Sequence, residues 1–451
     1  MRHHVNVLFR GGGPGVSRAT AGAAAPVATA PVTTADDQST LEVVPPMSPR
    51  DEAIFLLHTA AEIEHVLMVQ YLYAAWSLPQ DGPAVVQRWR RDILQIAREE
   101  MAHFASVQNL LRLIGGPLNF DREDFPFRTD FYPFPFRLEP LGRASLARYI
   151  AAEMPAEPDV DPRLIDEVVR LATGEGNGQP VNRVGALYNR LTTLFTDEEK
   201  LPDGLFRPDT ADDIQALPAR YRADVGRGPL YLRTVRNRDE ALSLLADIAS
   251  QGEGEEDTSR SHFLVFVDIF DAWPAGDDAA PSLDVPTHPN TTSTGSGSDD
   301  VDLAGGRITH PRAGAWASVF NHHYRMLLSW LQHALLTRVR DPASSGLSLQ
   351  AFAEMLVLSD VGALLTALPR AEDGSGRAGA PFELPYSLAF PDLPGDRWDH
   401  HRELVAGARA QIDAIGATSE AEEAIRQRVL SSIAAAEAFV DEYASDREDN
   451  S

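Results

Sequence analysis

The sequence predicts an all-α protein, on three observations. Apolar residues recur at steps of three and four along several long segments, which is the spacing of one face of a helix. No segment sustains the alternation of apolar and polar residues that a half-buried strand requires. No repeat of fixed period divides the chain. We therefore expect long helices packed side by side, joined by long loops.

The composition excludes several kinds of partner and metal site. The 451 residues carry 40 basic and 66 acidic side chains, a formal net charge of −26. Nucleic acids and anionic membrane surfaces require clustered Lys and Arg, so neither is expected as a partner. The chain has no Cys and 13 His, so any metal must be held by His, Asp and Glu. No uninterrupted apolar run reaches the roughly 18 residues of a membrane span, and we expect a cytoplasmic protein.

The first ordered element predicted is a long helix over 51–78. Ser48 can cap it, and Pro49 suits its first position. After a Pro- and Gly-containing break, a second long helix is predicted over 84–114, and the Gly-Gly-Pro sequence that follows ends it.

The rest of the chain divides into shorter helices and loops. Residues 118–140 are rich in Phe and Pro and are expected to form an extended loop. Further helices are predicted over 143–154, 161–174, 181–200, 238–250, 259–273, 312–340, 347–368 and 399–445.

The same pattern predicts the domain organisation. Two stretches hold few large apolar side chains and are expected to be unstructured. The expected parts are a disordered tail (1–46), a helical bundle (47–274), a flexible insert (275–306), a C-terminal helical part packed on the bundle (307–445) and a polar tail (446–451).

Three polar residues occupy positions where the pattern calls for apolar ones. Glu64 is the only acid on the apolar face of the first helix. Glu100 and His103 lie on the apolar face of the second helix, one turn apart. A lone Glu facing a core costs several kcal/mol unless it is paired, protonated or bound to a cation. Inward-facing acids with a Glu-x-x-His pair are typical of di-metal carboxylate bundles; a buried Glu–His or Glu–Arg pair without metal is the alternative.

The second half of the chain offers further candidate ligands. His262 shares an apolar face with the aromatic residues that follow it, and Glu253 lies nine residues before it. Glu153 lies at the end of the helix predicted over 143–154. Their spacing does not by itself distinguish metal ligands from ion pairs or solvated side chains.

Taken together, these segments resemble the ferritin-like domain of the iminophenylpyruvate dimer synthase type. The sequences EHVLMVQYLYAAWSL and EEMAHFASVQNLLRLIGG carry most of the resemblance, which extends over about residues 50–400. The later segments SQGEG, SHF, FNHHYRMLLSWL and AGAPFELP carry the rest.

The resemblance implies a ferritin-like bundle with a carboxylate–histidine metal centre that holds one or two iron ions, with manganese as an alternative. The ligand positions it assigns are those of Glu64, Glu100, His103, Glu153, Glu253 and His262. The sequence also departs from the pattern, because VGALYNRL has no carboxylate where a third bundle helix should offer one. The site can therefore be asymmetric, hold a single metal, or take Glu153 as its third-helix ligand.

The function expected from these inferences is that of an oxidoreductase in secondary metabolism. The leading hypothesis is a non-haem iron oxidase or oxygenase acting on an amino-acid-derived small molecule. The alternatives are oxidative coupling of two imine molecules, with haem left open as a cofactor, and a metal-binding bundle without turnover. His58, His65, His322 and His323 are the spare imidazoles for a haem. The sequence leaves open whether the protein forms a homo-oligomer.

Overall fold

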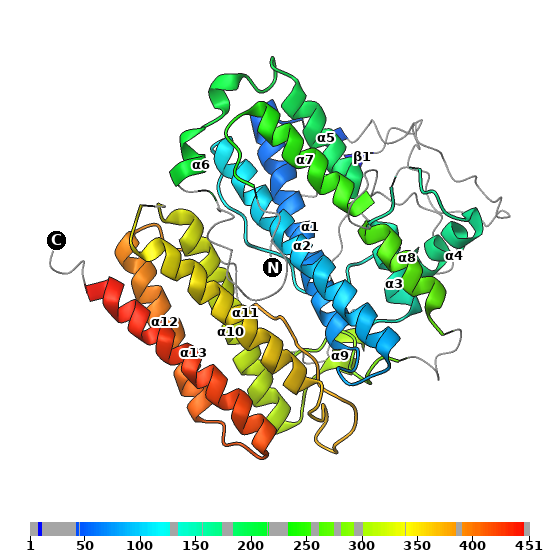
Figure 1. The fold of residues 1–451 in the computed structure, drawn as a ribbon, viewed down its shortest axis with the longest axis vertical. Coiled ribbons are helices and arrows are strands. Elements are labelled where there is room, and N and C mark those ends of the chain that lie inside the picture. The colour runs from blue at the N-terminus through cyan, green and yellow to red at the C-terminus, as the bar shows by residue number, and fades with distance from the viewer. Residues whose placement is uncertain are drawn as a thin grey trace, which may run out of the picture.

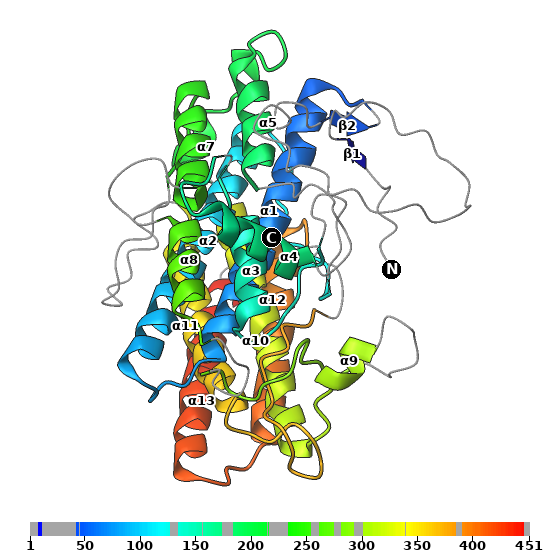
Figure 2. The same ribbon diagram turned by 90° about the vertical axis from the view of Figure 1, so that its right-hand side faces the viewer.

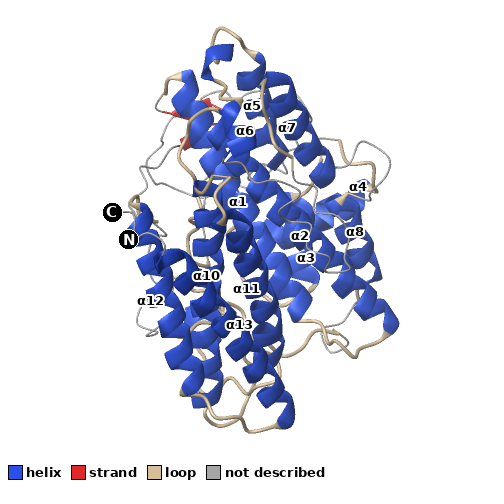
Figure 3. Cartoon of the chain, turned by 60° about the vertical axis from the view of Figure 1, so that its left-hand side comes forward, coloured by secondary structure: helices blue, strands red, loops and turns tan. Residues whose placement is uncertain are grey.

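The computed structural model describes most of the chain and shows a predominantly helical architecture. It covers residues 8–10, 42–44, 46–126, 134–155, 157–173, 184–213, 215, 233–253, 261–274, 281–292, 301–338, 340–384 and 390–445. Within these ranges the chain forms helices α1–α13, one short 3₁₀ helix and one pair of three-residue strands (Figures 1 and 3). The predicted all-α class is confirmed.

Two long helices form the centre of the N-terminal bundle. Helices α1 (Pro49–Trp76) and α2 (Ala84–Leu113) pack side by side along most of their length. The Ser48 side chain caps α1 as predicted, and Pro49 is its first residue. After α2, Gly115 adopts a φ of +70°, which favours glycine and turns the chain away.

The other two rods of this bundle are each built from two short helices. One rod consists of α3 (Arg143–Ala152) and α5 (Val184–Thr196), and the other of α7 (Arg238–Glu253) and α8 (His262–Ala272). Figure 2 shows α5 and α7 together at one end, with α3 and α8 below them. Both rods are thus interrupted at the same level of the bundle.

Smaller elements surround these rods. Helix α4 (Pro162–Thr173) packs on α3, while the 3₁₀ helix Asp203–Leu205 and helix α6 (Asp209–Asp213) follow α5.

A second bundle follows in the C-terminal part. It consists of α10 (Pro311–Leu336), α11 (Ala343–Leu365), α12 (Pro394–Asp413) and α13 (Glu420–Ser445), shown in yellow to red in Figure 1. The single helix predicted over 399–445 is wrong: the chain breaks after Asp413, and a new helix begins at Glu420. Gly416 lies shortly after the end of the first helix, and the Ser419 side chain accepts a hydrogen bond from the Glu422 amide to cap the second.

The two bundles share a buried interface. The Tyr324 hydroxyl of α10 lies 2.6 Å from Nε2 of His65 on α1, and Trp76 stacks on Phe382 at a ring separation of 5.7 Å. Helix α11 is long and apolar enough to cross a membrane by length and composition, and half of its most apolar window is buried inside the protein. That burial is typical of a core helix.

Segments predicted to be unstructured contain ordered parts. Within the expected flexible insert 275–306, residues 281–292 pack on the N-terminal bundle and α9 (Val301–Gly306) forms a short helix. The Leu283 amide donates to the Ser77 carbonyl at 2.7 Å, and the His288 amide donates to the Leu138 carbonyl at 2.6 Å. The expectation of flexibility therefore fails for these residues, because the insert supplies backbone donors to carbonyls that the bundle leaves open.

The N-terminal segment also differs in part from the expected disordered tail. Strands β1 (Leu8–Arg10) and β2 (Glu42–Val44) pair antiparallel, with Phe9 opposite Val43, and the Val43 side chain is buried. The rest of 1–45 and the expected polar tail 446–451 lie outside the described residues.

Candidate metal centre

Five buried side chains converge where the two short-helix rods are interrupted. They form two groups of possible metal ligands, Glu64–Glu100–His103 and Glu100–Glu153–His262, and within each group the ligand atoms lie within 4.8 Å of one another. Glu100 belongs to both groups. All five side chains are at most 5% exposed, so the centre is buried inside the bundle.

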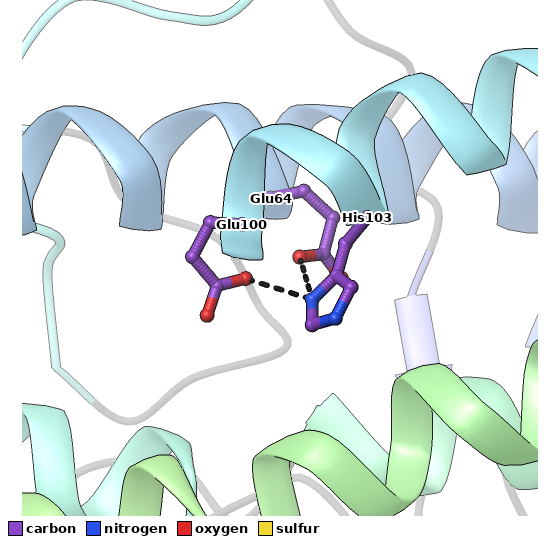
Figure 4. A group of neighbouring side chains, drawn as sticks. All are labelled: Glu64, Glu100 and His103. Carbon is purple, nitrogen blue, oxygen red and sulfur yellow. Dashed lines mark hydrogen bonds and ion pairs between the residues drawn. The ribbon is translucent and has the colours of Figure 1, made fainter. Parts of the chain in front are cut away.

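The two long helices supply the first group. Glu64 projects from α1 toward α2, where Glu100 and His103 lie one turn apart on the facing surface (Figure 4). Nδ1 of His103 lies 3.2 Å from a Glu100 oxygen and 3.4 Å from a Glu64 oxygen. The structure thus brings together the three residues that the helical pattern singled out.

Two helix ends supply the second group. Glu153 is the C-cap residue of α3, and His262 is the first residue of α8 after its N-cap Ser261. Nδ1 of His262 lies 2.8 Å from Oε1 of Glu100 and 3.8 Å from Oε2 of Glu153. The breaks in the rods therefore place a carboxylate and an imidazole opposite the first group.

Four further residues contact these side chains. The Tyr188 hydroxyl donates to Oε1 of Glu64, and the Tyr71 hydroxyl donates to Oε1 of Glu153 at 2.5 Å. Oε1 of Gln251 lies 2.6 Å from Nε2 of His103, and Oε2 of Glu99 lies 3.0 Å from Nε2 of His262. The sequence analysis missed these roles. Tyr188 comes from VGALYNRL, the segment without a carboxylate, so it fills that position with a hydroxyl.

The charges in the centre are strongly coupled. Burial raises the pKa of Glu64 to about 8, and the neighbouring Glu100 carboxylate adds to the shift. Burial opposes protonation of His103, but Glu100 and Glu64 outweigh it and raise its pKa to about 10. The same balance raises the pKa of His262 well above its usual value, chiefly through Glu100. Without a cation, the site therefore neutralises its acids with protons on its histidines.

The donor set fits one or two divalent cations. Glu64 Oε2, Glu100 Oε1 and His262 Nδ1 are buried without a well-formed hydrogen bond, although such atoms are almost always satisfied in native proteins. They face a cavity of about 20 Å³, which is large enough for a water molecule or an ion. Carboxylates and imidazoles are ligands that suit divalent iron and manganese.

The structure does not add the remaining predicted residues to this group. Glu253 is the last residue of α7, and its side chain lies outside the described part of the chain. The four spare imidazoles are engaged with protein atoms: His58 with the Pro117 carbonyl, His65 with Tyr324, His322 with the Leu404 carbonyl and His323 with Glu354.

Comparisons with known proteins agree with the architecture. A family model described as ferritin-like matches residues 57–271, which contain the whole candidate centre. Dichlorochromopyrrolate synthase of Lentzea aerocolonigenes is 28% identical over 401 aligned positions, which cover 76% of this chain and 37% of that protein. The 2-imino-3-(indol-3-yl)propanoate dimerase of Chromobacterium violaceum is 30% identical over 157 positions, covering 27% of this chain and 15% of that protein.

The chain thus spans little more than a third of the first of these relatives. A crystal structure of a ferritin-like protein from Caulobacter vibrioides overlaps 70% of this chain and 96% of its own, at a TM-score of 0.43 and 18% sequence identity. The resemblance inferred from the sequence is confirmed by the family model and by the two curated relatives.

Proposed function

We propose that this chain, whose residues 57–271 form a ferritin-like domain, is an iron-dependent oxidase or oxygenase acting on an amino-acid-derived small molecule. The observation that carries the proposal is the convergence of five buried ligand-type side chains around Glu100. Burying three carboxylates together is costly unless protons or a cation compensate their charge, and a divalent cation would compensate it at the ligand atoms themselves.

The residues divide into two sets that would hold two ions. Glu64 and His103 would serve one position, Glu153 and His262 the other, and Glu100 both. Iron held by carboxylates and imidazoles supplies redox chemistry and reactivity toward dioxygen; manganese suits the same ligands.

The protein's own residues prepare this centre. The Tyr71 and Tyr188 hydroxyls each bond one oxygen of an outer carboxylate, which leaves the other oxygen directed at the cavity. Between the usual range of a carboxyl and about pH 8, Glu64 holds a proton that it must release before it can act as a ligand. The burial of the five side chains largely shields them from bulk solvent.

The size of the cavity constrains how a substrate approaches. A volume of about 20 Å³ admits a water-sized molecule, whereas an amino-acid-derived compound is many times larger. Ala152, Gly185, Ala249 and Gly252 line the cavity with small side chains. We place the organic substrate outside this wall, within electron-transfer distance of the residues that would hold the iron.

A second candidate is oxidative coupling of two imine molecules, favoured by the two curated relatives. One of them is named for dimerising 2-imino-3-(indol-3-yl)propanoate. The proposal also includes a cytoplasmic location and a small molecule as the main partner, in keeping with a net charge of −26.

Metal analysis, an absorption spectrum and oxygen consumption test the proposal together. Two iron equivalents without a Soret band, and oxygen uptake stimulated by an α-amino or α-imino acid, are the expected results. A Soret band would favour the haem-assisted coupling reaction. A protein that binds neither iron nor manganese would refute both enzymatic readings.

The mass of the product distinguishes the two proposed reactions. Oxidation of a single molecule yields one product of similar mass, whereas coupling yields a product of about twice the mass. Mass spectrometry of the reaction distinguishes them, and Glu100→Gln, which keeps the shape of the side chain, serves as the inactive control.

A further inference from the structure

The candidate centre has an internal near-symmetry around Glu100. On one side lie Glu64 and His103, on the other Glu153 and His262. Each outer carboxylate accepts a hydrogen bond from a tyrosine hydroxyl, Tyr188 in the first half and Tyr71 in the second.

The two imidazoles are also oriented alike. Nδ1 of His103 and Nδ1 of His262 both face Glu100, at 3.2 Å and 2.8 Å. Their Nε2 atoms face away from the cavity toward an oxygen acceptor each. A ring that donates from Nε2 carries its free lone pair on Nδ1, so both rings present Nδ1 to a cation.

The symmetry fails at the acceptors that hold these rings. Nε2 of His103 faces the Gln251 amide oxygen at 2.6 Å, whereas Nε2 of His262 faces the Glu99 carboxylate at 3.0 Å. Glu99 is held in turn by Gln95, whose amide donates to its other oxygen at 2.7 Å. One imidazole is thus held by a neutral amide and the other by an anion.

This difference matters for metal affinity. A charge-assisted hydrogen bond is stronger than a neutral one, and an anionic acceptor on the far nitrogen makes the near nitrogen a better electron donor. The outer carboxylates have matching tyrosine partners, so among the described residues Glu99 and Gln251 are the main chemical difference between the halves.

We infer that the two cation positions are inequivalent, and that Glu99 makes the Glu100–Glu153–His262 position the tighter one. Glu99 is a positioning residue: it contacts no cation and acts through His262. The inference rests on the proposed function only in requiring that the centre bind divalent metal.

Titration of the metal-free full-length protein with Mn(II) tests this inference. Calorimetry and the EPR signal of free Mn(II) should resolve two binding steps in the wild type. Glu153→Gln should weaken the tighter step most, and Glu64→Gln the weaker step, which assigns each step to a position.

The acceptor variants then test the cause. Glu99→Gln keeps the hydrogen bond but removes the charge, and it should weaken the tighter step by about 10–100-fold while leaving the other step unchanged. Gln251→Glu should strengthen the weaker step by a similar factor. Glu99→Asp retains the charge and should recover part of the affinity that Glu99→Gln loses.

A control variant and two contrary results complete the test. Glu167→Gln makes the same chemical change on α4, where Glu167 pairs with Arg143 away from the centre, and should alter neither step. Two equal steps in the wild type, or a tighter step unaffected by Glu99→Gln, would overturn this inference and leave the proposed function standing. Absence of any Mn(II) or Fe(II) binding would refute the proposed function itself.

Discussion

Glu100 is the residue that joins the two halves of the centre. Its Oε2 faces His103 and its Oε1 faces His262, so each oxygen serves a different histidine. The two positively charged imidazoles hold its pKa well below the usual range, against the opposing effect of burial. Glu100 is therefore the anion that compensates both histidines in the metal-free protein, and under the proposed function it would be the shared ligand of the two cations.

Glu100→Gln should abolish the paired binding of metal. An amide is a weaker ligand than a carboxylate, and the loss should exceed the roughly 10–100-fold cost of losing an outer partner. Metal analysis after dialysis against Fe(II) or Mn(II) measures this stoichiometry. Glu403→Gln on the exposed surface of α12 is the matched control and should bind metal as the wild type does. Two retained equivalents in Glu100→Gln would contradict a shared role.

His262→Ala should remove much of the stabilisation that metal provides. Ligand binding at a hundredfold excess over the dissociation constant stabilises a protein by about 2.7 kcal/mol. From the sequence alone, His262 is either a metal ligand or one member of an ion pair. In the structure it contacts both Glu99 and Glu100. We therefore expect the variant to be less stable without metal as well. Denaturant unfolding with and without Mn(II) measures both effects, and an undiminished metal response would show that His262 is not a ligand.

The sequence predicted ligand positions wherever a polar residue interrupted an apolar helical face. Glu64, Glu100 and His103 are such positions, and the structure brings their side chains together. Glu153 was a weaker candidate because a helix-end Glu is usually solvated. Glu99 could not be found this way, because its side chain is 21% exposed, at the edge of the apolar face of α2, and its partner lies 163 residues later in the chain.

At the scale of helices, the interrupted rods create the centre. Helix α3 ends next to Glu153, and α8 begins at His262. Tyr188 lies in the first turns of α5, and Gln251 in the last turn of α7. Where a helix ends, fewer side chains project into the interior than along a continuous helix. This arrangement leaves room for a cavity between four helix ends.

Gly252→Ala should weaken metal binding through this geometry. A Cβ atom at position 252 would lie 3.1 Å from Oε2 of Glu153, closer than most real contacts, so the carboxylate must shift. We expect a several-fold loss of Mn(II) affinity. In Gly314→Ala on α10, the added methyl meets nothing within 4 Å, and helix propensity should stabilise the protein by up to about 1 kcal/mol. Equal metal affinity in both variants would contradict the prediction.

The segment 281–292 should contribute measurably to stability. Replacing it with a Gly/Ser linker of equal length removes the buried Val285 and the backbone bonds to Ser77 and Leu138. Burial of one Val side chain is worth about 1.5–3 kcal/mol, so a loss of about 2 kcal/mol or more is expected in urea unfolding. Replacing the exposed loop 372–375 in the same way should cost far less. An unchanged midpoint for the 281–292 variant would support the original expectation of a flexible insert.

Helices with long apolar faces were predictable, and irregular segments were not. The predicted ranges 51–78 and 84–114 agree with α1 and α2 to within two residues. Residues 281–292 have no periodic apolar face from which their order could be predicted. Backbone hydrogen bonds to distant carbonyls hold them instead, and composition does not encode such bonds. The break between α12 and α13 carried local signals in Gly416 and Ser419, but amphipathic spacing on both sides concealed them.

At the scale of the whole molecule, four of the buried histidines among the described residues form two classes with opposite pKa shifts. His65 lies at the contact between the bundles and His401 inside the C-terminal bundle, and burial lowers the pKa of both well below the usual value. His103 and His262 face carboxylates, which raise their pKa values. The first class stays neutral in the folded protein, whereas the second stays charged.

These two classes predict a stability maximum near pH 6.5 in the metal-free protein. Below about pH 6.5 the unfolded chain protonates His65 and His401 while the folded protein does not, so stability falls as pH falls. Above about pH 6.5 the folded protein retains the protons on His103 and His262 that the unfolded chain releases, so stability falls as pH rises. Glu64, with a pKa of about 8, adds to the second loss. Each group contributes up to about 1.4 kcal/mol per pH unit.

Bound metal should reverse the loss of stability above about pH 6.5. A cation binds deprotonated ligands, so its stabilising effect grows as rising pH removes the protons of His103, His262 and Glu64. Urea unfolding at about pH 5.5, 6.5 and 8, in chelator and in excess Mn(II), measures both profiles. In chelator the middle value should be highest; in Mn(II) the protein should be most stable at the highest pH. His401→Gln should flatten the acidic side alone. If metal-free stability rises steadily up to about pH 8, the buried centre does not hold charged histidines, and the charge balance inferred around Glu100 is wrong.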